Sequence, residues 1–382
     1  MNRRRFIETA GAGAAAVAAS RALASQDEPL DSNVLRDVPM VQFGTTACLC
    51  FVGSTGSAMR YLGEDVTDDF LMGVSGGAFT IFWGVPWCDC NCDILYLGDE
   101  PIDRTFSALG YEHARFREPN RNDPGDAEER LRKAIVESID RGTPVIAQGP
   151  VGPPEAGVIA GYEDSGQVLS GWSYFQEDFS VYFRAEDWFA KCIGLIVVGD
   201  KKETPSRQQV LKSTLEWAVA LAREPERFSR RPPDGGEGQR LIAGLAAYDA
   251  FAEALEKDES FPEGDLETLT SRLVPIGNDG VHLMGCKRDA AVRFLTSVAE
   301  WDLPGADEVK SAADAYSAGA FLWKQAGAST PWTGAPEAKR LEIADRALRT
   351  KLAGLIRDAK VHEARAVSLL EEALAKLATE GA

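Results

Sequence analysis

The most regular hydrophobic pattern lies in the second half of the chain, where apolar residues recur every three or four positions. This spacing places them on one face of an α-helix. Strand patterns nearly vanish after Asp200, so we expect an all-helical domain over residues 204–382. Its predicted helices fall within residues 206–224, 238–257, 286–301, 307–327 and 337–377.

The first half mixes helical patterns with short apolar runs. Helices are predicted over 50–62, after a Thr67 N-cap, and over 126–141. Four strand-like runs follow, separated by turn residues. The runs are 143–149, 155–163, 167–172 and 191–200. Helices that precede a group of strands predict an α+β domain, which we place at residues 37–203.

The N-terminus follows neither pattern. Residues 1–24 combine Arg3-Arg4-x-Phe6-Ile7 with a mildly apolar stretch and a cleavage-like Ala22-Leu23-Ala24. These features resemble a twin-arginine signal peptide, which predicts a periplasmic or secreted protein. Retention as an uncleaved anchor is the competing interpretation. Residues 25–36 are polar and predict a disordered lead, and residues 38–44 predict a short strand or extended segment.

Composition limits the class of partner. The 382 residues are 45% hydrophobic, enough for two domains with cores, and carry a formal net charge of −18. Cleavage after residue 24 would remove four arginines and one glutamate, so the formal net charge of the remaining chain would be −21. An acidic chain is a poor match for phosphate backbones, so no nucleic acid is expected. After residue 24 the sequence contains no run of 18 apolar residues, so no stable membrane span is predicted.

Two of the seven cysteines stand at the start of the first predicted helix. A thiol at a helix N-terminus meets unpaired N–H groups and the helix dipole, which favour the thiolate. Cys50 and Cys48 both compete for this position. The helix length to Gly63 favours Cys50. The alternative is that Cys50 is a small buried apolar residue.

The motifs around these cysteines resemble a known family. They are Cys50-x-x-Gly53, Ala58 to Gly63, Leu71 to Phe79, Gly142 to Ile146 and Gly161 to Asp164. The pattern is similar to papain-like proteins of the bacteriocin-processing peptidase type and to the butirosin biosynthesis acyltransferase N-terminal domain. The helical remainder is similar to the extension of those relatives through the segments at 244–251 and 287–295. The resemblance implies a papain-like domain followed by a helical domain.

The resemblance also implies catalytic roles. Cys50 would be the nucleophile, and a histidine before Gly161 would accept its proton. That place holds Glu155 or Ala156, and the orienting position offers Ser173. Glu155 could serve as a general base or only cap a turn, and an anion there would disfavour a thiolate. His113, the one histidine of this domain, is the other candidate for a catalytic supporting role, and the alternative is an ordinary surface or core histidine. Gln42, six residues before Cys48, matches the oxyanion-hole glutamine of papain-like proteins.

A second cysteine cluster follows at residues 87–93. In an extended strand Cys88, Cys90 and Cys92 would share one face, which suits zinc or copper(I). The usual two-residue zinc spacing is absent, and a disulfide from this segment to Cys48 or another cysteine is the alternative. No cofactor is otherwise expected.

Three functions remain open at this point. The first is an exported papain-like protein with degenerate catalytic residues that binds a peptide or small metabolite in the interdomain cleft. The second is an acyltransferase or amide hydrolase that uses Cys50. The third is a thiolate metal-binding or redox protein centred on Cys88, Cys90 and Cys92. The missing histidine favours the first.

Overall fold

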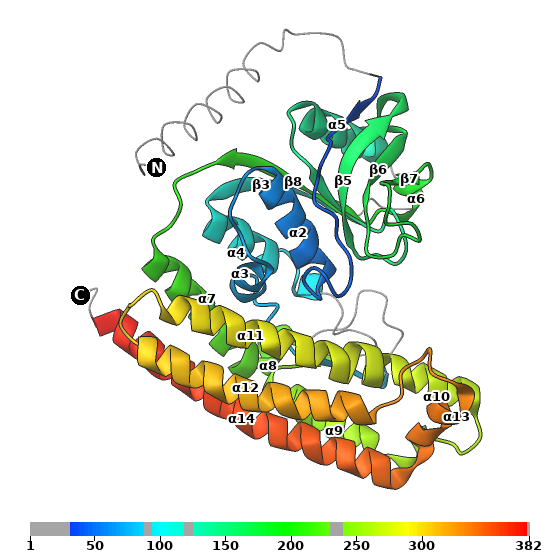
Figure 1. The fold of residues 1–382 in the computed structure, drawn as a ribbon, viewed down its shortest axis with the longest axis vertical. Coiled ribbons are helices and arrows are strands. Elements are labelled where there is room, and N and C mark those ends of the chain that lie inside the picture. Colours follow the sequence, from blue (N-terminus) through cyan, green and yellow to red (C-terminus); the bar gives the residue numbers. More distant parts are fainter. Residues whose placement is uncertain (1–30, 88–93, 118–124, 230–239, 380–382) are drawn as a thin grey trace, which may run out of the picture.

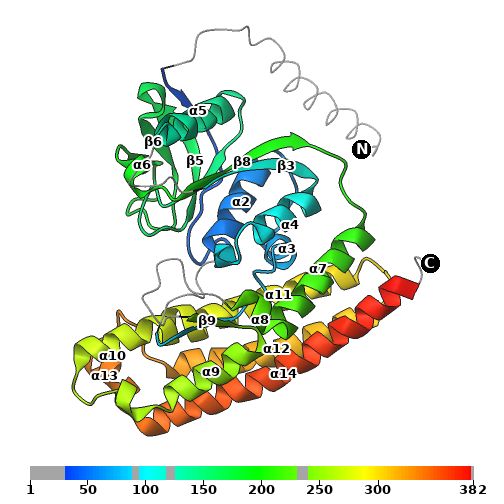
Figure 2. The ribbon, with the colours of Figure 1, turned by 180° about the vertical axis from the view of Figure 1, so that it is seen from behind.

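The computed structural model describes residues 31–87, 94–117, 125–229 and 240–379. It is an α+β protein, as the sequence predicts: a sheet with helices against it lies above a layer of long helices (Figures 1 and 2). We call residues 31–201 the sheet part and residues 204–379 the helical part. Among the described residues, no helix has both the length and the apolar character needed to cross a membrane.

The sheet has seven strands, and every strand pair in it is antiparallel. Six strands follow the order β3-β8-β4-β5-β6-β7, and β1 pairs with β5. The four strand-like runs predicted between residues 143 and 200 are confirmed as β4, β5, β6 and β8. The strands are β1 (Asn33–Val34), β3 (Tyr111–Arg117), β4 (Val145–Gln148), β5 (Ala156–Glu163), β6 (Val168–Trp172), β7 (Phe183–Ala185) and β8 (Gly194–Lys201).

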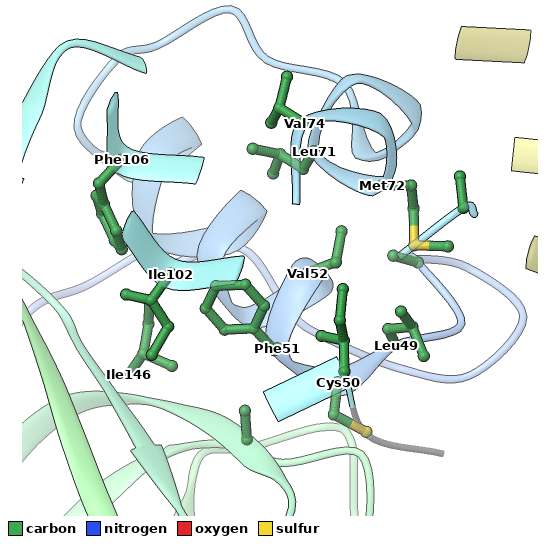
Figure 3. Packing of buried hydrophobic residues seen from close by; sticks show 14 of the residues in the cluster. Leu49, Cys50, Phe51, Val52, Leu71, Met72, Val74, Ile102, Phe106 and Ile146 are labelled. Atoms are coloured by element: carbon green, nitrogen blue, oxygen red, sulfur yellow. The ribbon is translucent and has the colours of Figure 1, made fainter. Parts of the chain in front are cut away.

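Helices lie against both faces of this sheet (Figure 1). The helix α2 (Cys50–Tyr61) packs on β4 and β5, and α4 (Glu100–Leu109) packs on β3. Figure 3 shows Phe51 of α2 facing Ile102 and Ile146 in a fully buried cluster. The helix α5 (Ala127–Asp140) contacts the other face, where the Tyr162 hydroxyl donates to Asp140 at 2.8 Å.

Local signals place several helix ends correctly. The helix α3 (Asp68–Val74) begins after Thr67, whose hydroxyl accepts a hydrogen bond from the Phe70 N–H at 3.1 Å. Gly63 ends α2 with φ of 89°, a backbone conformation that glycine adopts at little cost. Both features match the prediction from the sequence.

Two N-terminal segments differ from expectation. Within the lead predicted to be disordered, Asn33 and Val34 form β1, because they pair with Tyr162 and Gly161 at the edge of β5. The Asn33 side chain also donates to Asp140 at 2.9 Å. Residues 38–44 form no strand and run instead into a turn that precedes α2.

The helical part contains the predicted long helices. The helix α14 packs along α12, α9 and α7, and α11 packs between α12 and α3 (Figure 2). A π-helix, η4, leads directly into α11. The elements are α7 (Arg207–Arg223), α8 (Pro225–Phe228), α9 (Leu245–Leu255), α10 (Leu266–Leu273), η4 (Val274–His282), α11 (Leu283–Ala299), α12 (Ala306–Ser329), α13 (Glu337–Leu341) and α14 (Arg346–Thr379).

Contacts cross the boundary predicted between residues 203 and 204. The strand β9 (Arg240–Ala243) pairs with β2 (Phe82–Val85), so the helix predicted over residues 238–257 is wrong at its start: these four residues are extended by pairing with β2, and the helix begins only at Leu245. One buried hydrophobic cluster also includes residues from both parts. Gly73 of α3 lies so close to Phe294 of α11 that an added Cβ would be 2.3 Å from the ring. The two parts therefore share one core along α3 and α11.

Candidate functional site

The N-terminus of α2 is the centre of the candidate site. Leu49 is the N-cap in an extended conformation, and its side chain supplies no capping hydrogen bond. Cys50 is therefore the first helical residue, as the helix length predicts. Its side chain is buried, with 3% of the residue exposed, and its sulfur points away from Phe51 (Figure 3). A helix start of this kind offers backbone N–H groups to a thiolate.

Tyr174 closes one side of this helix start. Its hydroxyl donates to the Ala47 carbonyl at 3.0 Å and shares a hydrogen bond with Thr46 at 2.8 Å. It also approaches α2 so closely that a Cβ on Gly53 would lie 1.7 Å from the tyrosine oxygen. Burial raises the pKa of Tyr174, so the hydroxyl stays protonated. The glycine of the Cys50-x-x-Gly53 motif is thus required by this contact.

Glu155 stands at the start of β5, the strand that packs on the same helix. It immediately precedes β5, and its carbonyl accepts a hydrogen bond from Gly149 N–H at 3.0 Å. The next carbonyl, that of Ala156, accepts from Ser54 one turn along α2 from Cys50, at 3.2 Å. One carboxylate oxygen of Glu155 is buried. The structure therefore brings Glu155 and Cys50 to neighbouring elements.

Ser173, expected at the orienting position, follows β6. Trp172 pairs with Val158, so Ser173 lies beside the start of β5. Its hydroxyl donates to the Val151 carbonyl at 3.3 Å and accepts from the Phe175 N–H at 3.2 Å. These bonds hold the loop after β6 rather than orient a general base.

His113 lies elsewhere. It is on β3, which β8 and β4 separate from β5, and three strand spacings amount to about 14 Å. Its ring stacks on Phe106 at 4.9 Å, and its Nε2 is 2.9 Å from an Asp103 carboxylate oxygen. The structure does not bring His113 to Cys50, since its ring is engaged with α4.

Gln42 begins the turn that leads into α2. Its carbonyl accepts hydrogen bonds from Thr45 and Thr46, and its N–H donates to the Thr46 hydroxyl at 3.2 Å. Because Thr46 also contacts Tyr174, this turn and the tyrosine are fixed together. The backbone of Gln42 thus holds the turn that leads into α2.

Cys48 and the other cysteines take different positions. Cys48 is half-buried, and Cys286 of α11 together with burial raises the pKa of its thiol. Cys88, Cys90 and Cys92, proposed as metal ligands, lie outside the described residues. Within the residues that are described, no group of three or more histidine, cysteine or acidic side chains could hold a metal ion.

A buried charge network joins the two parts and was not found from the sequence. Arg288 of α11 and Glu363 of α14 are both buried and form two hydrogen bonds, at 2.7 and 2.8 Å. Tyr248 also donates to Glu363, at 2.9 Å. Burial raises the pKa of Glu363, while Arg288 and Tyr248 act to lower it. The sequence signal for it was the Lys287-Arg288 pair within the apolar spacing of α11.

This network reaches the glycine-rich loop of the sheet part. Arg288 donates to the Ala78 carbonyl at 2.7 Å, and the buried Lys287 ammonium donates to the Thr80 hydroxyl at 3.1 Å. Gly76 of the same loop adopts φ of 86° and lies against Trp217 of α7. The Gly76-Gly77 motif therefore serves to dock the helical part.

A pocket of about 220 Å³ lies where α3 and α4 meet α7. Arg104 lines it and donates to the Ser213 carbonyl at 3.2 Å, with its guanidinium 4.4 Å from the Trp217 ring centre. The lining mixes apolar and polar groups. It consists of Val74, Arg104, Ser107, Ala108, Pro205, Gln209, Val210, Ser213 and Thr214. It is thus a small hollow between the sheet part and the helical part.

No protein-family model matches this sequence, and no curated protein matches it either. Function is therefore inferred from the residues of the chain itself.

Proposed function

We propose that this chain is an exported papain-like protein that keeps the cysteine of the fold without its histidine, and that it binds a small metabolite between the sheet part and the helical part. The observation that carries this proposal is the placement of Glu155. It stands at the start of β5, where the resemblance calls for a histidine, and the carbonyl of the next residue, Ala156, accepts a hydrogen bond from Ser54, one turn along α2 from the buried Cys50. A carboxylate there disfavours the thiolate that peptidase chemistry needs.

The packing around Cys50 supports binding elsewhere. Tyr174 is held against α2 by hydrogen bonds to Thr46 and Ala47 and occupies the side of the helix next to Gly53. A peptide laid beside Cys50 would have to displace this buried ring. The pocket between α4 and α7 needs no such movement. At about 220 Å³ it is smaller than the roughly 300–1,000 Å³ of drug-sized sites, which favours a small metabolite over a peptide.

The alternative function is acyl transfer by Cys50. Its position as the first residue of a helix favours this chemistry, because helix N-termini stabilise thiolates. The two functions differ in what they require of Glu155. Acyl transfer needs Glu155 to act as a base, whereas a binding protein does not.

Replacing Glu155 with histidine tests this difference. With acetyl-N-acetylcysteamine as the acyl donor, we expect the wild type to acquire little acetyl on Cys50 and E155H to acquire it about a hundredfold faster, because an imidazole accepts the thiol proton near neutral pH. Peptide mass spectrometry measures the modified fraction of Cys50. E155Q controls for loss of the carboxylate, and C50S for acetylation at other sites. Equal rates for the wild type and E155H, both lost in C50S, would instead establish the acyltransferase function.

Binding in the pocket between α4 and α7 is tested by filling it. Ser107 lies on its exposed rim, so S107W blocks the pocket without disturbing the core. We expect a free amino acid at 100 times its Kd to stabilise the wild type by about 2.7 kcal/mol and S107W not at all. Thermal unfolding with this ligand measures the effect. S311W, on the exposed face of α12, is the matched control. Stabilisation that survives in S107W would place the ligand elsewhere.

A further inference from the structure

The pocket between α4 and α7 offers a ligand two kinds of contact. Among its described lining residues, Arg104 is the one with a charged side chain, whereas Val74, Ala108 and Val210 are aliphatic. An anionic ligand therefore meets a charge of opposite sign there, and a cationic ligand meets a charge of its own sign. A small molecule with an acidic group and a short hydrocarbon part matches this lining.

Arg104 is fixed before any ligand arrives. Its Nη1 donates to the Ser213 carbonyl at 3.2 Å and to the Ser213 hydroxyl at 3.1 Å. Its guanidinium also lies 4.4 Å from the ring centre of Trp217, whose own Nε1 donates to the Ser75 carbonyl at 3.1 Å. Because the arginine side chain is already ordered, binding of an anion costs little of its conformational entropy.

Glu100 contacts the other edge of the guanidinium, one turn before Arg104 on α4. The Nε and Nη2 atoms of Arg104 lie 2.9 and 2.7 Å from the same oxygen, Oε1 of Glu100. A guanidinium pairs best with a carboxylate when each of two N–H groups meets its own oxygen. The Glu100 side chain is also 41% exposed, and exposed ion pairs contribute little to stability. A better-matched carboxylate can therefore take its place.

We propose that Arg104 anchors the carboxylate of a small aliphatic carboxylic acid, which displaces Glu100 from the Nε and Nη2 edge of the guanidinium. The hydrocarbon part of the acid lies against Val74, Ala108 and Val210. The binding is non-covalent, and the displaced Glu100 carboxylate turns to solvent. This inference rests on the proposed function of the same pocket, and it adds the chemical class of the ligand and the residue that selects it.

The test compares three probes of similar size and branching: isobutyrate, isobutyramide and isobutylamine. Each is titrated into the full chain at pH 7 and fixed ionic strength, and calorimetry measures its Kd. We expect the Kd of isobutyrate to be at least about tenfold lower than that of isobutyramide, because hydrogen bonds to a charged acceptor are the stronger ones. Isobutylamine should not bind. S107W should abolish the binding of isobutyrate, since it fills the pocket.

Two positions separate the anchor from its competitor. E100Q removes the competing carboxylate and should lower the Kd of isobutyrate about two- to fivefold, with no change for isobutyramide. R104M should raise the Kd of isobutyrate at least about tenfold, and R104K, which keeps the charge without the planar fork, should fall between R104M and the wild type. E128Q is the matched control for E100Q, because Glu128 pairs with Arg132 at the same four-residue spacing on α5, outside the pocket lining.

The results that would overturn this inference differ from those that would overturn the proposed function. Equal Kd values for isobutyrate and isobutyramide, both lost in S107W, would keep the pocket as the binding site and remove the role of the carboxylate. A preference for isobutyrate that survives in R104M would place the anchor on another residue. Binding of a free amino acid without binding of isobutyrate would also contradict the inference alone.

If neither isobutyrate nor a free amino acid binds the wild type, the proposed function fails together with the inference. Near-UV circular dichroism of R104M, compared with the wild type, separates lost binding from a lost fold.

Discussion

Replacing Arg288 with methionine should lower the free energy of unfolding by about 3–5 kcal/mol. The guanidinium makes two hydrogen bonds to the Glu363 carboxylate and one to the Ala78 carbonyl, all in the interior. Without it the carboxylate would remain buried with Tyr248 as its neutral donor, and the Ala78 carbonyl would lose a donor. Urea unfolding followed by tryptophan fluorescence measures the change in the midpoint and in the free energy.

The loss should also depend on pH in a defined direction. Burial raises the pKa of Glu363 and Arg288 opposes it, so R288M leaves the effect of burial largely unopposed. An acid whose folded pKa lies above its unfolded value binds more protons in the folded state, so its effect on stability becomes more unfavourable as pH rises. The cost of R288M relative to the wild type should therefore be largest near pH 7 and shrink toward pH 4.5.

Two variants serve as controls for this prediction. The hydrogen bonds between Arg357 and Glu256 are as short as those of the buried pair, at 2.6 and 2.7 Å, but both side chains are exposed to solvent. Because exposed ion pairs contribute little to stability, R357M should cost less than about 1 kcal/mol. The double variant R288M/E363M removes both buried charges and should recover much of the loss. A cost for R288M no greater than that for R357M would contradict a structural role for the buried pair.

The sequence predicts elements whose signals are local. The Thr67 cap, the Gly63 stop and the three- and four-residue spacing of the long helices each depend on neighbouring residues, and each is confirmed. The pairing of β2 with β9 has no such signal, because each strand has four residues and the two lie far apart in the chain. The strand β1 was missed for the same reason, since its partner is the edge of β5.

In the candidate site, too, the features that depend on local signals were predictable and those that depend on long-range packing were not. The start of α2 at Cys50 follows from local helix signals, and the position of Glu155 before β5 follows from the strand pattern. The Arg288–Glu363 pair depends on how α11 and α14 both pack against α12. The spacing of residues along the sequence carries no information on how helices dock. For the same reason the sequence could not predict that His113 lies on β3, remote from β5.

Replacing Gly53 with alanine should destabilise the protein by about 1–3 kcal/mol, although alanine is normally better than glycine inside a helix by about 1 kcal/mol. The sign is reversed because the new methyl group would lie 1.7 Å from the Tyr174 oxygen and 2.9 Å from the ring carbon that carries it. G354A provides the matched control, since nothing lies within 4 Å of a Cβ added at this position of α14. It should be neutral or stabilising in the same urea unfolding measurement.

Combining G53A with Y174F shows whether Tyr174 is fixed against α2. Y174F removes the oxygen that the methyl group would meet, so the double variant should be less destabilised than the sum of the two single variants. If Tyr174 instead swings away from α2 without cost, G53A behaves like G354A and the two substitutions are simply additive. A peptide could then lie beside the start of α2, which would favour acyl transfer by Cys50 over binding in the pocket between α4 and α7. The size of the coupling between Gly53 and Tyr174 therefore bears directly on whether Cys50 can meet a substrate.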